Sequence, residues 1–377
     1  MKNKLRILKS KIRGNIFNAR GWKTGRKLLI IESDDWGSIR MPSKEVYNKF
    51  IDKSFDIKRS LYNRLDSLAS EDDLQALFNV LNSFQDKKGN PLVITANTVV
   101  ANPDFEKIEK SNFQNYEYEL FTETLNKYPN HANAFSLWKE GIDKKLFTPQ
   151  FHAREHLNVA LWMQALQSNN DDVIRYTFKN QTTYSGKNDY SFMDAFDFEK
   201  KEELESLKII LKDGLDLFEK IFGYRSKSFI APCYIWHPEV EHTLKESGVE
   251  YFQGMRHQLI PTEEHFKYRK VKHNMGDINT YGQYYLTRNA TFEPSSIEGM
   301  DWVNYCFSQI ETAFAWNKPA IITSHRVNYV GFLDKNNRDR SLELLTALIQ
   351  KVQKKWPEVE FLSSDQLGDM IKASKNG

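Results

Sequence analysis

Short apolar segments alternate with helical segments along most of this chain, and that alternation constrains the fold more than any other feature. The apolar segments are a few residues long and rich in β-branched side chains, as buried strands are. The segments between them have the period of amphipathic helices, and the helix expected at residues 202–222 ends at Gly223. The predicted strands are at residues 27–31, 92–96, 147–152, 228–232, 249–252, 284–288, 320–324 and 359–362.

Strands and helices that alternate in this way predict a parallel α/β architecture. Seven or eight repeats of the pattern favour a distorted (β/α) barrel over an open sheet. The chain has 377 residues, of which 40% are apolar, so it can bury a large core. We expect a basic amphipathic segment at residues 1–26 and one barrel domain at residues 27–370, with long helical and loop insertions.

Two adjacent aspartates, Asp34 and Asp35, come directly after the first predicted strand. Each carboxylate loses water at such a position, and the two charges repel each other. A bound cation would offset both costs, which predicts a metal site. The alternative is that one of the aspartates caps a following helix.

A pair of histidines, His152 and His156, comes at the end of the third predicted strand. On a helical turn this i, i+4 spacing places both imidazoles on one side. Two imidazoles and one carboxylate form a common zinc site that leaves room for water and substrate. The alternative is two unrelated histidines at the start of a helix.

Other chemistry-bearing residues also follow predicted strands. In a barrel the C-terminal ends of the strands meet at one face, where active sites lie. The residues in such positions are Asp34, Asp35, His152, His156, Tyr234, Arg288 and His325. Their shared position predicts that they form a single site.

Residues 1–26 carry many lysines and arginines and no acidic residue. The apolar side chains that fall near one helical face are Leu5, Ile7, Leu8, Ile12, Ile16 and Phe17. A basic amphipathic helix of this kind suits peripheral contact with an anionic membrane. The alternatives are a basic helix packed on the barrel and a frayed terminus.

The segment lacks the features of a secretory signal, and no apolar run is long enough to span a bilayer. We therefore expect a cytoplasmic protein with at most peripheral membrane contact. The formal net charge of +3 does not predict a nucleic-acid partner. Cys233 and Cys306 form no disulfide or metal-binding pattern.

The order of these motifs resembles that of the polysaccharide deacetylases of carbohydrate esterase family four. That family has an Asp-Asp pair, similar to Ser33-Asp34-Asp35, and a His-x-x-x-His motif, similar to residues 152–156. Its third region is a strand ending in Pro and Tyr between two helices, similar to residues 217–254 with Phe229–Tyr234 at their centre. Its last motif is a strand that ends in His, similar to Ile321–His325.

The resemblance implies a metal-dependent hydrolase that removes acetyl groups from N-acetylated or O-acetylated sugars of a poly- or oligosaccharide. It implies a divalent metal, zinc being the expected ion, and an acetylated glycan as partner. Asp35, His152 and His156 would hold the metal, with Asp34 as the base and His325 as the acid. Substrate contacts would come from Tyr234, Arg288 and Trp302, the last in an Asp-Trp motif at residues 301–302.

The chain departs from the family in its third motif, where the usual arginine is replaced by Ile230 or Ala231. Arg288 and Arg154 are the candidates to replace it. Two other functions stay open. Residues 152–156 also fit the H-x-x-E-H pattern of inverted zinc peptidases, in which Glu155 is the base. The absent arginine allows a non-catalytic carbohydrate-binding protein on the same scaffold.

Overall fold

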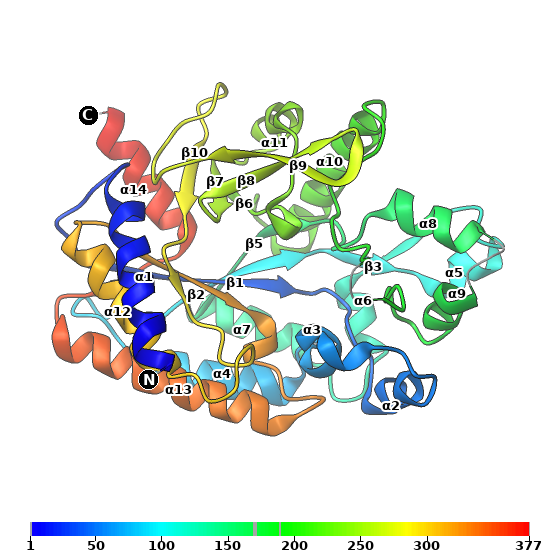
Figure 1. The fold of residues 1–377 in the computed structure, drawn as a ribbon, viewed down its shortest axis with the longest axis horizontal. Helices are drawn as coiled ribbons and strands as arrows, with labels where there is room; N and C mark the ends of the chain where they lie inside the picture. The colour runs from blue at the N-terminus through cyan, green and yellow to red at the C-terminus, as the bar shows by residue number, and fades with distance from the viewer. Residues whose placement is uncertain (1, 169–171, 188–189, 377) are drawn as a thin grey trace.

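Nine parallel strands form one curled sheet in the computed structural model, which describes residues 2–168, 172–187 and 190–376 (Figure 1). The strands are β1 (Leu28–Trp36), β2 (Ile94–Val99), β5 (Phe147–Ala153), β6 (Ser228–Phe229), β7 (Tyr251–Gly254), β10 (Tyr284–Thr287), β11 (Ala290–Thr291), β12 (Ala320–His325) and β13 (Glu360–Phe361). Their order is β10-β7-β6-β5-β2-β1-β12-β11, and β13 pairs with β1 beside this path. Every strand that the sequence predicts is present.

The two edge strands of the sheet, β10 and β11, are consecutive along the chain. Only Arg288 and Asn289 separate them. Three Cα steps span at most about 11 Å, so the sheet has to curl until its two edges approach each other. The fold is therefore the distorted (β/α) barrel that the sequence predicts.

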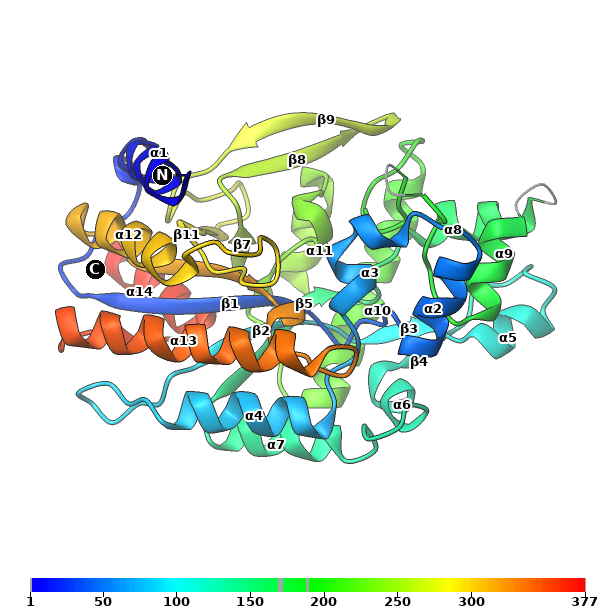
Figure 2. The same cartoon turned by 60° about the horizontal axis from the view of Figure 1, so that its bottom comes forward.

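Helices cover the outside of this barrel. Figure 2 shows α4, α7 and α13 stacked below the sheet, with α12 beside α13. The covering helices are α4 (Glu71–Asn82), α7 (Ala134–Asp143), α10 (Glu203–Phe222), α11 (Glu241–Glu246), α12 (Trp302–Ala315), α13 (Lys335–Lys355) and α14 (Ser364–Asn376). Two of their ends follow local rules, because Ser70 and Asp73 form a capping box on α4 and Gly223 ends α10 in the left-handed conformation.

Insertions extend the barrel on the side of its candidate site. One is the antiparallel hairpin of β8 (His257–Thr262) and β9 (Glu264–Lys272), and another is the pair β3 (Ala101–Pro103) and β4 (Tyr118–Leu120). Short helices make up the rest: α2 (Lys44–Asp52), α3 (Leu61–Leu65), α5 (Phe105–Lys110), α6 (Phe121–Asn126), α8 (Val159–Gln167) and α9 (Asp172–Lys179).

Strand β1 is buried on both faces, which explains its unbroken apolar start. Leu29 and Ile31 belong to the core between the sheet and its outer helices. Leu28 and Ile30 belong to a separate core with Ile321 and residues of β7, β10 and α14. This alternation places the polar end of β1 at the open end of the barrel.

The N-terminal helix α1 (Lys2–Asn18) lies along α12 on the outside of the barrel (Figure 1). A Cβ on Gly14 would meet Thr312 Cγ2 at 3.2 Å, so the two helices approach closely there. The predicted apolar face is divided, because Ile7 and Phe17 are half-buried while the other four side chains are exposed. The proposed division of the chain at residue 26 stays a prediction. None of the described helices has the length and apolarity needed to cross a bilayer.

Candidate metal centre and active site

Strand β1 ends in an irregularity that turns two consecutive carboxylates, Asp34 and Asp35, toward the same site. In a regular strand, neighbouring side chains point to opposite faces. The register of β1 against β2 shifts between Ser33 and Trp36, and Asp35 has a left-handed φ of 73°. Such a bulge re-aims side chains, so Asp34 and Asp35 both face histidines. Asp34 Oδ2 lies 3.7 Å from His325 Nε2, and Asp35 Oδ1 lies 3.5 Å from His152 Nε2.

Asp35, His152 and His156 form a buried group whose candidate ligand atoms all lie within 4.8 Å of one another. Asp35 Oδ1 is 3.4 Å from His156 Nε2, nearly the same distance as from His152 Nε2. His152 is in β5 and His156 is in the bend that follows it. The two rings meet edge to face, with their centroids 5.0 Å apart.

The chemistry of these side chains fits a divalent ion. His152 Nδ1 lies 2.8 Å from the carbonyl oxygen of Ile230, so it is placed to donate and to leave Nε2 as the electron-pair donor. That Nε2 is buried without a hydrogen-bond partner among the described residues. Burial lowers the pKa of His156 well below its usual range, which favours the neutral imidazole that a metal needs.

Asp35 is the anionic member of this group. Its burial opposes ionisation, but the Arg40 guanidinium beside it holds the pKa of its carboxyl well below the usual range. Arg40 Nη2 donates to Asp35 Oδ2 at 3.1 Å, and Arg40 Nε lies 3.5 Å from Asp66. Oδ1 of Asp35 is thereby left to face the histidines.

Asp34 has a different set of partners, dominated by Arg288. The Arg288 guanidinium donates to both carboxylate oxygens of Asp34 at 2.6 Å, and it also pairs with the buried Glu32. Asn97 Nδ2 donates to Asp34 Oδ1 at 2.7 Å. Burial opposes the charge on Asp34, but Arg288 and the nearby histidines outweigh it and lower its pKa to about 2.

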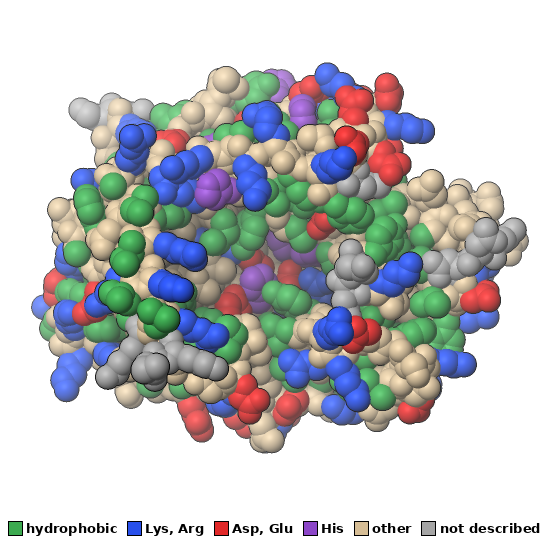
Figure 3. All heavy atoms as spheres, viewed as in Figure 1, with side chains coloured by type: hydrophobic (Ala, Val, Ile, Leu, Met, Phe, Trp, Pro, Cys, Tyr) green, Lys and Arg blue, Asp and Glu red, His purple; other side chains and the backbone are tan. Residues whose placement is uncertain are grey.

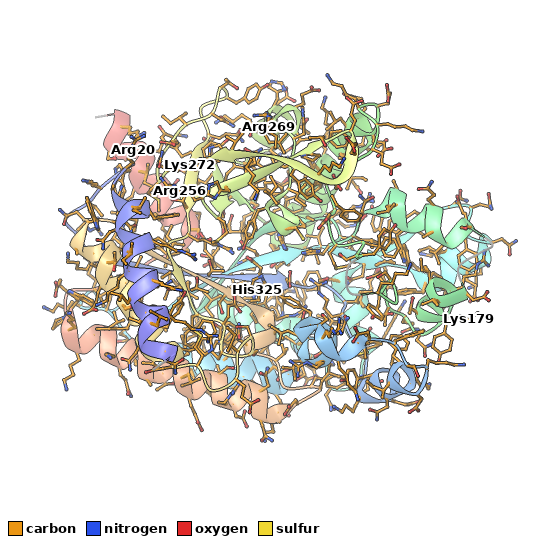
Figure 4. The ribbon with its side chains drawn as sticks, in the orientation of Figure 1. Arg20, Lys179, Arg256, Arg269, Lys272 and His325 are labelled. Atoms are coloured by element: carbon orange, nitrogen blue, oxygen red, sulfur yellow. The ribbon has the colours of Figure 1, made fainter. Side chains whose placement is uncertain are left out.

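His325 lies at the end of β12, opposite Asp34 in the register of β1 and β12, and near the centre of the open face (Figure 4). Its Nδ1 is 2.6 Å from Glu293 Oε1, which leaves Nε2 toward Asp34. Burial disfavours the charged ring, but Glu293 and the two aspartates raise the pKa of His325 to about 10. Figure 3 shows a hollow in the middle of this face, with histidine and acidic side chains at its base.

The predicted substrate residues lie in different places. Tyr234 has a left-handed φ of 61°, and its hydroxyl accepts from Arg288 Nη1 at 3.3 Å, so it borders the site. Trp302 lines a cavity of about 470 Å³ beneath α1, and its Nε1 donates to the carbonyl of Ile297. The side chain of Arg288 has no exposed surface, so we assign it to holding Asp34 rather than to touching substrate.

The structure decides three points that the sequence leaves open. No helical turn holds the histidine pair, because His152 is in a strand and His156 in a bend. Glu155 pairs with Arg154 at 2.6 and 2.7 Å instead of facing the histidines, so the inverted peptidase arrangement is absent. Arg154 also pairs with Asp213, which leaves Arg288 as the partner of Asp34.

Several residues of the site are missing from the sequence interpretation. The sequence does point to Asn97, because this residue directly follows the predicted strand at residues 92–96 and lies in β2, beside β1. No sequence pattern indicates Glu293 or Arg40, because they reach the site from loops whose paths depend on tertiary contacts. The carbonyl of Ile230 is a backbone group that no side-chain pattern reveals.

Comparisons with known proteins agree with the fold. No model of a protein family matches the sequence, and a search of curated proteins also finds no match. A "putative glycoside hydrolase/deacetylase" from Parabacteroides distasonis has a similar structure, with a TM-score of 0.50 and 7% identity. The match covers 92% of this chain and 71% of that one, and it supports a shared barrel architecture.

Two further structures have lower scores. A "putative polysaccharide deacetylase" from Mycobacterium smegmatis matches with a TM-score of 0.47 and 10% identity, over 95% of this chain and 94% of that one. A 4-alpha-glucanotransferase from Thermococcus litoralis matches with a TM-score of 0.41 and 10% identity, over 90% of this chain. The match spans only 40% of that glucanotransferase. At these identities the likeness concerns the fold, and the function has to be argued from the site.

Proposed function

We propose that this protein is a metal-dependent hydrolase that removes acetyl groups from the sugars of a poly- or oligosaccharide. One observation carries the proposal: a carboxylate locked by an arginine, Asp34, lies between a buried Asp-His-His group and a protonated histidine, His325. A base, a metal group and an acid around one opening are the parts that hydrolysis of an amide or ester requires.

The metal would be held by Asp35, His152 and His156, and zinc is the expected ion because it favours two imidazoles and one carboxylate. When bound, such an ion makes water more acidic and polarises a carbonyl group. The site is otherwise built by the chain. Ile230 orients one ligand through its carbonyl, and Arg40 holds the outer oxygen of Asp35.

Asp34 would accept the proton of the attacking water. Arg288 and Asn97 fix both of its oxygens, so its orientation is set before substrate arrives. His325 would donate a proton to the leaving amine or alkoxide, because its raised pKa keeps the ring protonated at neutral pH. Glu293 holds Nδ1 of that ring, so Nε2 carries the proton to be donated.

The non-catalytic alternative stays open, but the position of Arg288 weakens the argument for it. It depended on the absence of an arginine beside the proposed base, and Arg288 provides one from a different strand end. The glycan class is supported by the resemblance of the motifs to the deacetylase family. The predicted contacts of Tyr234 and Trp302 with substrate stay predictions.

The test is acetate release from a panel of N- and O-acetylated glycans, with zinc-reconstituted protein. General-base catalysis contributes roughly 10²–10⁴-fold, so Asp34→Asn should lose about that much in kcat while it retains its metal. Asp35→Asn should instead lose metal to a chelator and regain part of its rate in excess zinc. Asp334→Asn, at the exposed N-cap of α13, is the matched control and should keep both metal and rate.

Two results would contradict the proposal. Loss of metal from Asp34→Asn with retention in Asp35→Asn would reverse the roles of the two aspartates. Metal-loaded wild type that binds glycans but releases no acetate from any of them would favour the carbohydrate-binding alternative.

A further inference from the structure

Helix α1 turns its aliphatic side chains away from the protein. Leu5, Leu8, Ile12 and Ile16 follow the spacing i, i+3, i+7 and i+11, which places them on one stripe of a helix. Their exposed fractions are 53%, 56%, 56% and 66%, the largest concentration of exposed aliphatic side chains on any described element. We call these four residues the α1 stripe.

The opposite face of α1 attaches the helix to the barrel through polar contacts. Gln309 Nε2 donates to Ser10 Oγ at 2.8 Å, and Trp316 Nε1 donates to Asn15 Oδ1 at 2.7 Å. Asn289 Nδ2 donates to Asn18 Oδ1 at 3.0 Å. Hydrogen bonds and the close approach at Gly14 therefore dock the helix, and the stripe stays mostly exposed.

Cations flank the α1 stripe on both sides. Helical spacing places Arg6, Lys9 and Arg13 on one side and Lys11 on the other. Among the α1 side chains that the structure describes, only Lys11 has a carboxylate partner, Glu311 at 3.6 Å. Arg6, Lys9 and Arg13 are exposed, and their charges can meet an anionic surface.

The basic rim continues from α1 onto the β8–β9 hairpin. Figure 4 shows Arg20, Arg256 and Lys272 together where the chain leaves α1. Arg20 and Lys272 are exposed, whereas Arg256 is buried and lies over the ring of Phe17, 5.0 Å from its centroid, which joins the two elements. Burial and the neighbouring Arg20 lower the pKa of Arg256, and the carboxylate of Asp277 opposes this effect without cancelling it.

The stripe and its rim lie on the face into which the candidate site opens. Figure 3 shows apolar and basic side chains over α1 beside the central hollow. Figures 1 and 2 both place α1 and the hairpin on the same outer side of the barrel. A flat partner that covers this side would therefore face the site.

We propose that the α1 stripe inserts into the interface of an anionic lipid bilayer, with the cations of α1 and the hairpin against the lipid headgroups. An apolar helix face bordered by lysine and arginine is what interfacial binding requires. The charge complements anionic lipid, and the helix is already formed and anchored before it binds. Docked in this way, the molecule turns its candidate site toward the membrane.

The experiment is flotation of the full-length protein with vesicles that contain no sugar, so its result is independent of the proposed hydrolase activity. Vesicles of phosphatidylcholine mixed with phosphatidylglycerol should carry the protein upward, whereas pure phosphatidylcholine should carry much less. The double variant Leu8→Gln/Ile12→Gln should lower the ratio of bound to free protein at least about tenfold. Arg13→Gln should lower it about fivefold, and added salt should weaken binding of the wild type.

Matched controls come from the exposed side of α10. Ile209, 69% exposed, and Lys212, also exposed, lie outside α1 and the hairpin, so Ile209→Gln and Lys212→Gln should bind vesicles as the wild type does. Unchanged thermal unfolding of the double variant would show that it folds normally, as expected for exposed side chains.

Three outcomes would overturn the proposal. One is absence of flotation with anionic vesicles, or flotation that the double variant leaves unchanged. Another is a dimer of the wild type that the double variant dissociates, without vesicle binding, which would identify a second copy as the cover of the stripe. The third is retention on heparin that depends on Arg13 but not on Ile12, without vesicle binding, which would identify a soluble polyanion as the partner.

Discussion

Asp34 and Asp35 are adjacent in the sequence, yet their surroundings prepare them for different work. Asp34 is held at both oxygens by Arg288, whereas Asp35 gives one oxygen to Arg40 and turns the other to two histidines. The left-handed backbone at Asp35 makes this possible, and aspartate tolerates that conformation better than most residues. A single backbone irregularity thus separates a candidate base from a candidate ligand.

A second residue-level effect concerns Glu293, which should control the pH range in which His325 can donate a proton. The pKa of His325 is raised to about 10, from an ordinary value near ~6.5. The protonated ring is favoured in the folded state, so its contribution to stability is complete below pH ~6.5 and is lost as the pH rises through about 10. We expect Glu293→Gln to lower this pKa and to move the basic limb of the pH–rate profile to lower pH.

The measurement is kcat/KM against pH for wild type and Glu293→Gln on one acetylated glycan. Glu298→Gln, in the same loop, is the control and should leave the profile in place. A basic limb that does not move in Glu293→Gln would show that another group sets it.

Arg288 links the elements that close the barrel. It comes directly after β10, and its side chain pairs with Glu32 and Asp34 of β1 with no exposed surface. Ser364, at the start of α14, donates to Glu32 as well. Two buried carboxylates of β1 therefore depend on a single guanidinium.

We expect Arg288→Met to lower the free energy of unfolding by about 3–5 kcal/mol, because it leaves Glu32 and Asp34 buried without the arginine that pairs with both. Arg26→Met breaks the partly exposed pair with Glu360 and should cost no more than about 1 kcal/mol. Urea unfolding at neutral pH measures both. An equal loss of unfolding free energy in the two variants would mean that the buried ion pairs of Arg288 stabilise the fold no more than a partly exposed ion pair does.

For the whole molecule, a bound metal should act as a clamp across the open end of the barrel, because its candidate ligands come from β1, β5 and the bend after β5. Binding to the folded state alone stabilises it by about 2.7 kcal/mol at a free ion concentration 100-fold above Kd. For a chain of 377 residues this corresponds to a rise in Tm of roughly 3 °C.

Thermal unfolding with zinc and with a chelator measures this rise. We expect zinc to raise the Tm of the wild type relative to chelator, and we expect no such rise in His152→Ala. His242→Ala, an exposed histidine on α11, is the control and should keep the difference. A wild-type Tm that does not respond to zinc would count against the metal centre.

The order of strands and helices is determined by the sequence alone, because the period of apolar residues reports which face each element buries. All eight predicted strands are present, and the residues at their ends include most of the site. β11 and the β8–β9 hairpin escape prediction, the first because two residues carry little pattern and the second because β9 is largely polar and exposed.

Only the tertiary structure decides which residues pair. Arg288 lies far from Asp34 in the sequence, and it reaches Asp34 because the sheet curls until β10 approaches β1. Glu293 reaches His325 from a loop, and Ile230 contributes a backbone carbonyl, so neither role has a local signature. The direction of the α1 stripe is equally nonlocal. An amphipathic sequence specifies that a helix has an apolar face, but the polar side chains of α12 and its neighbours decide that this face points outward.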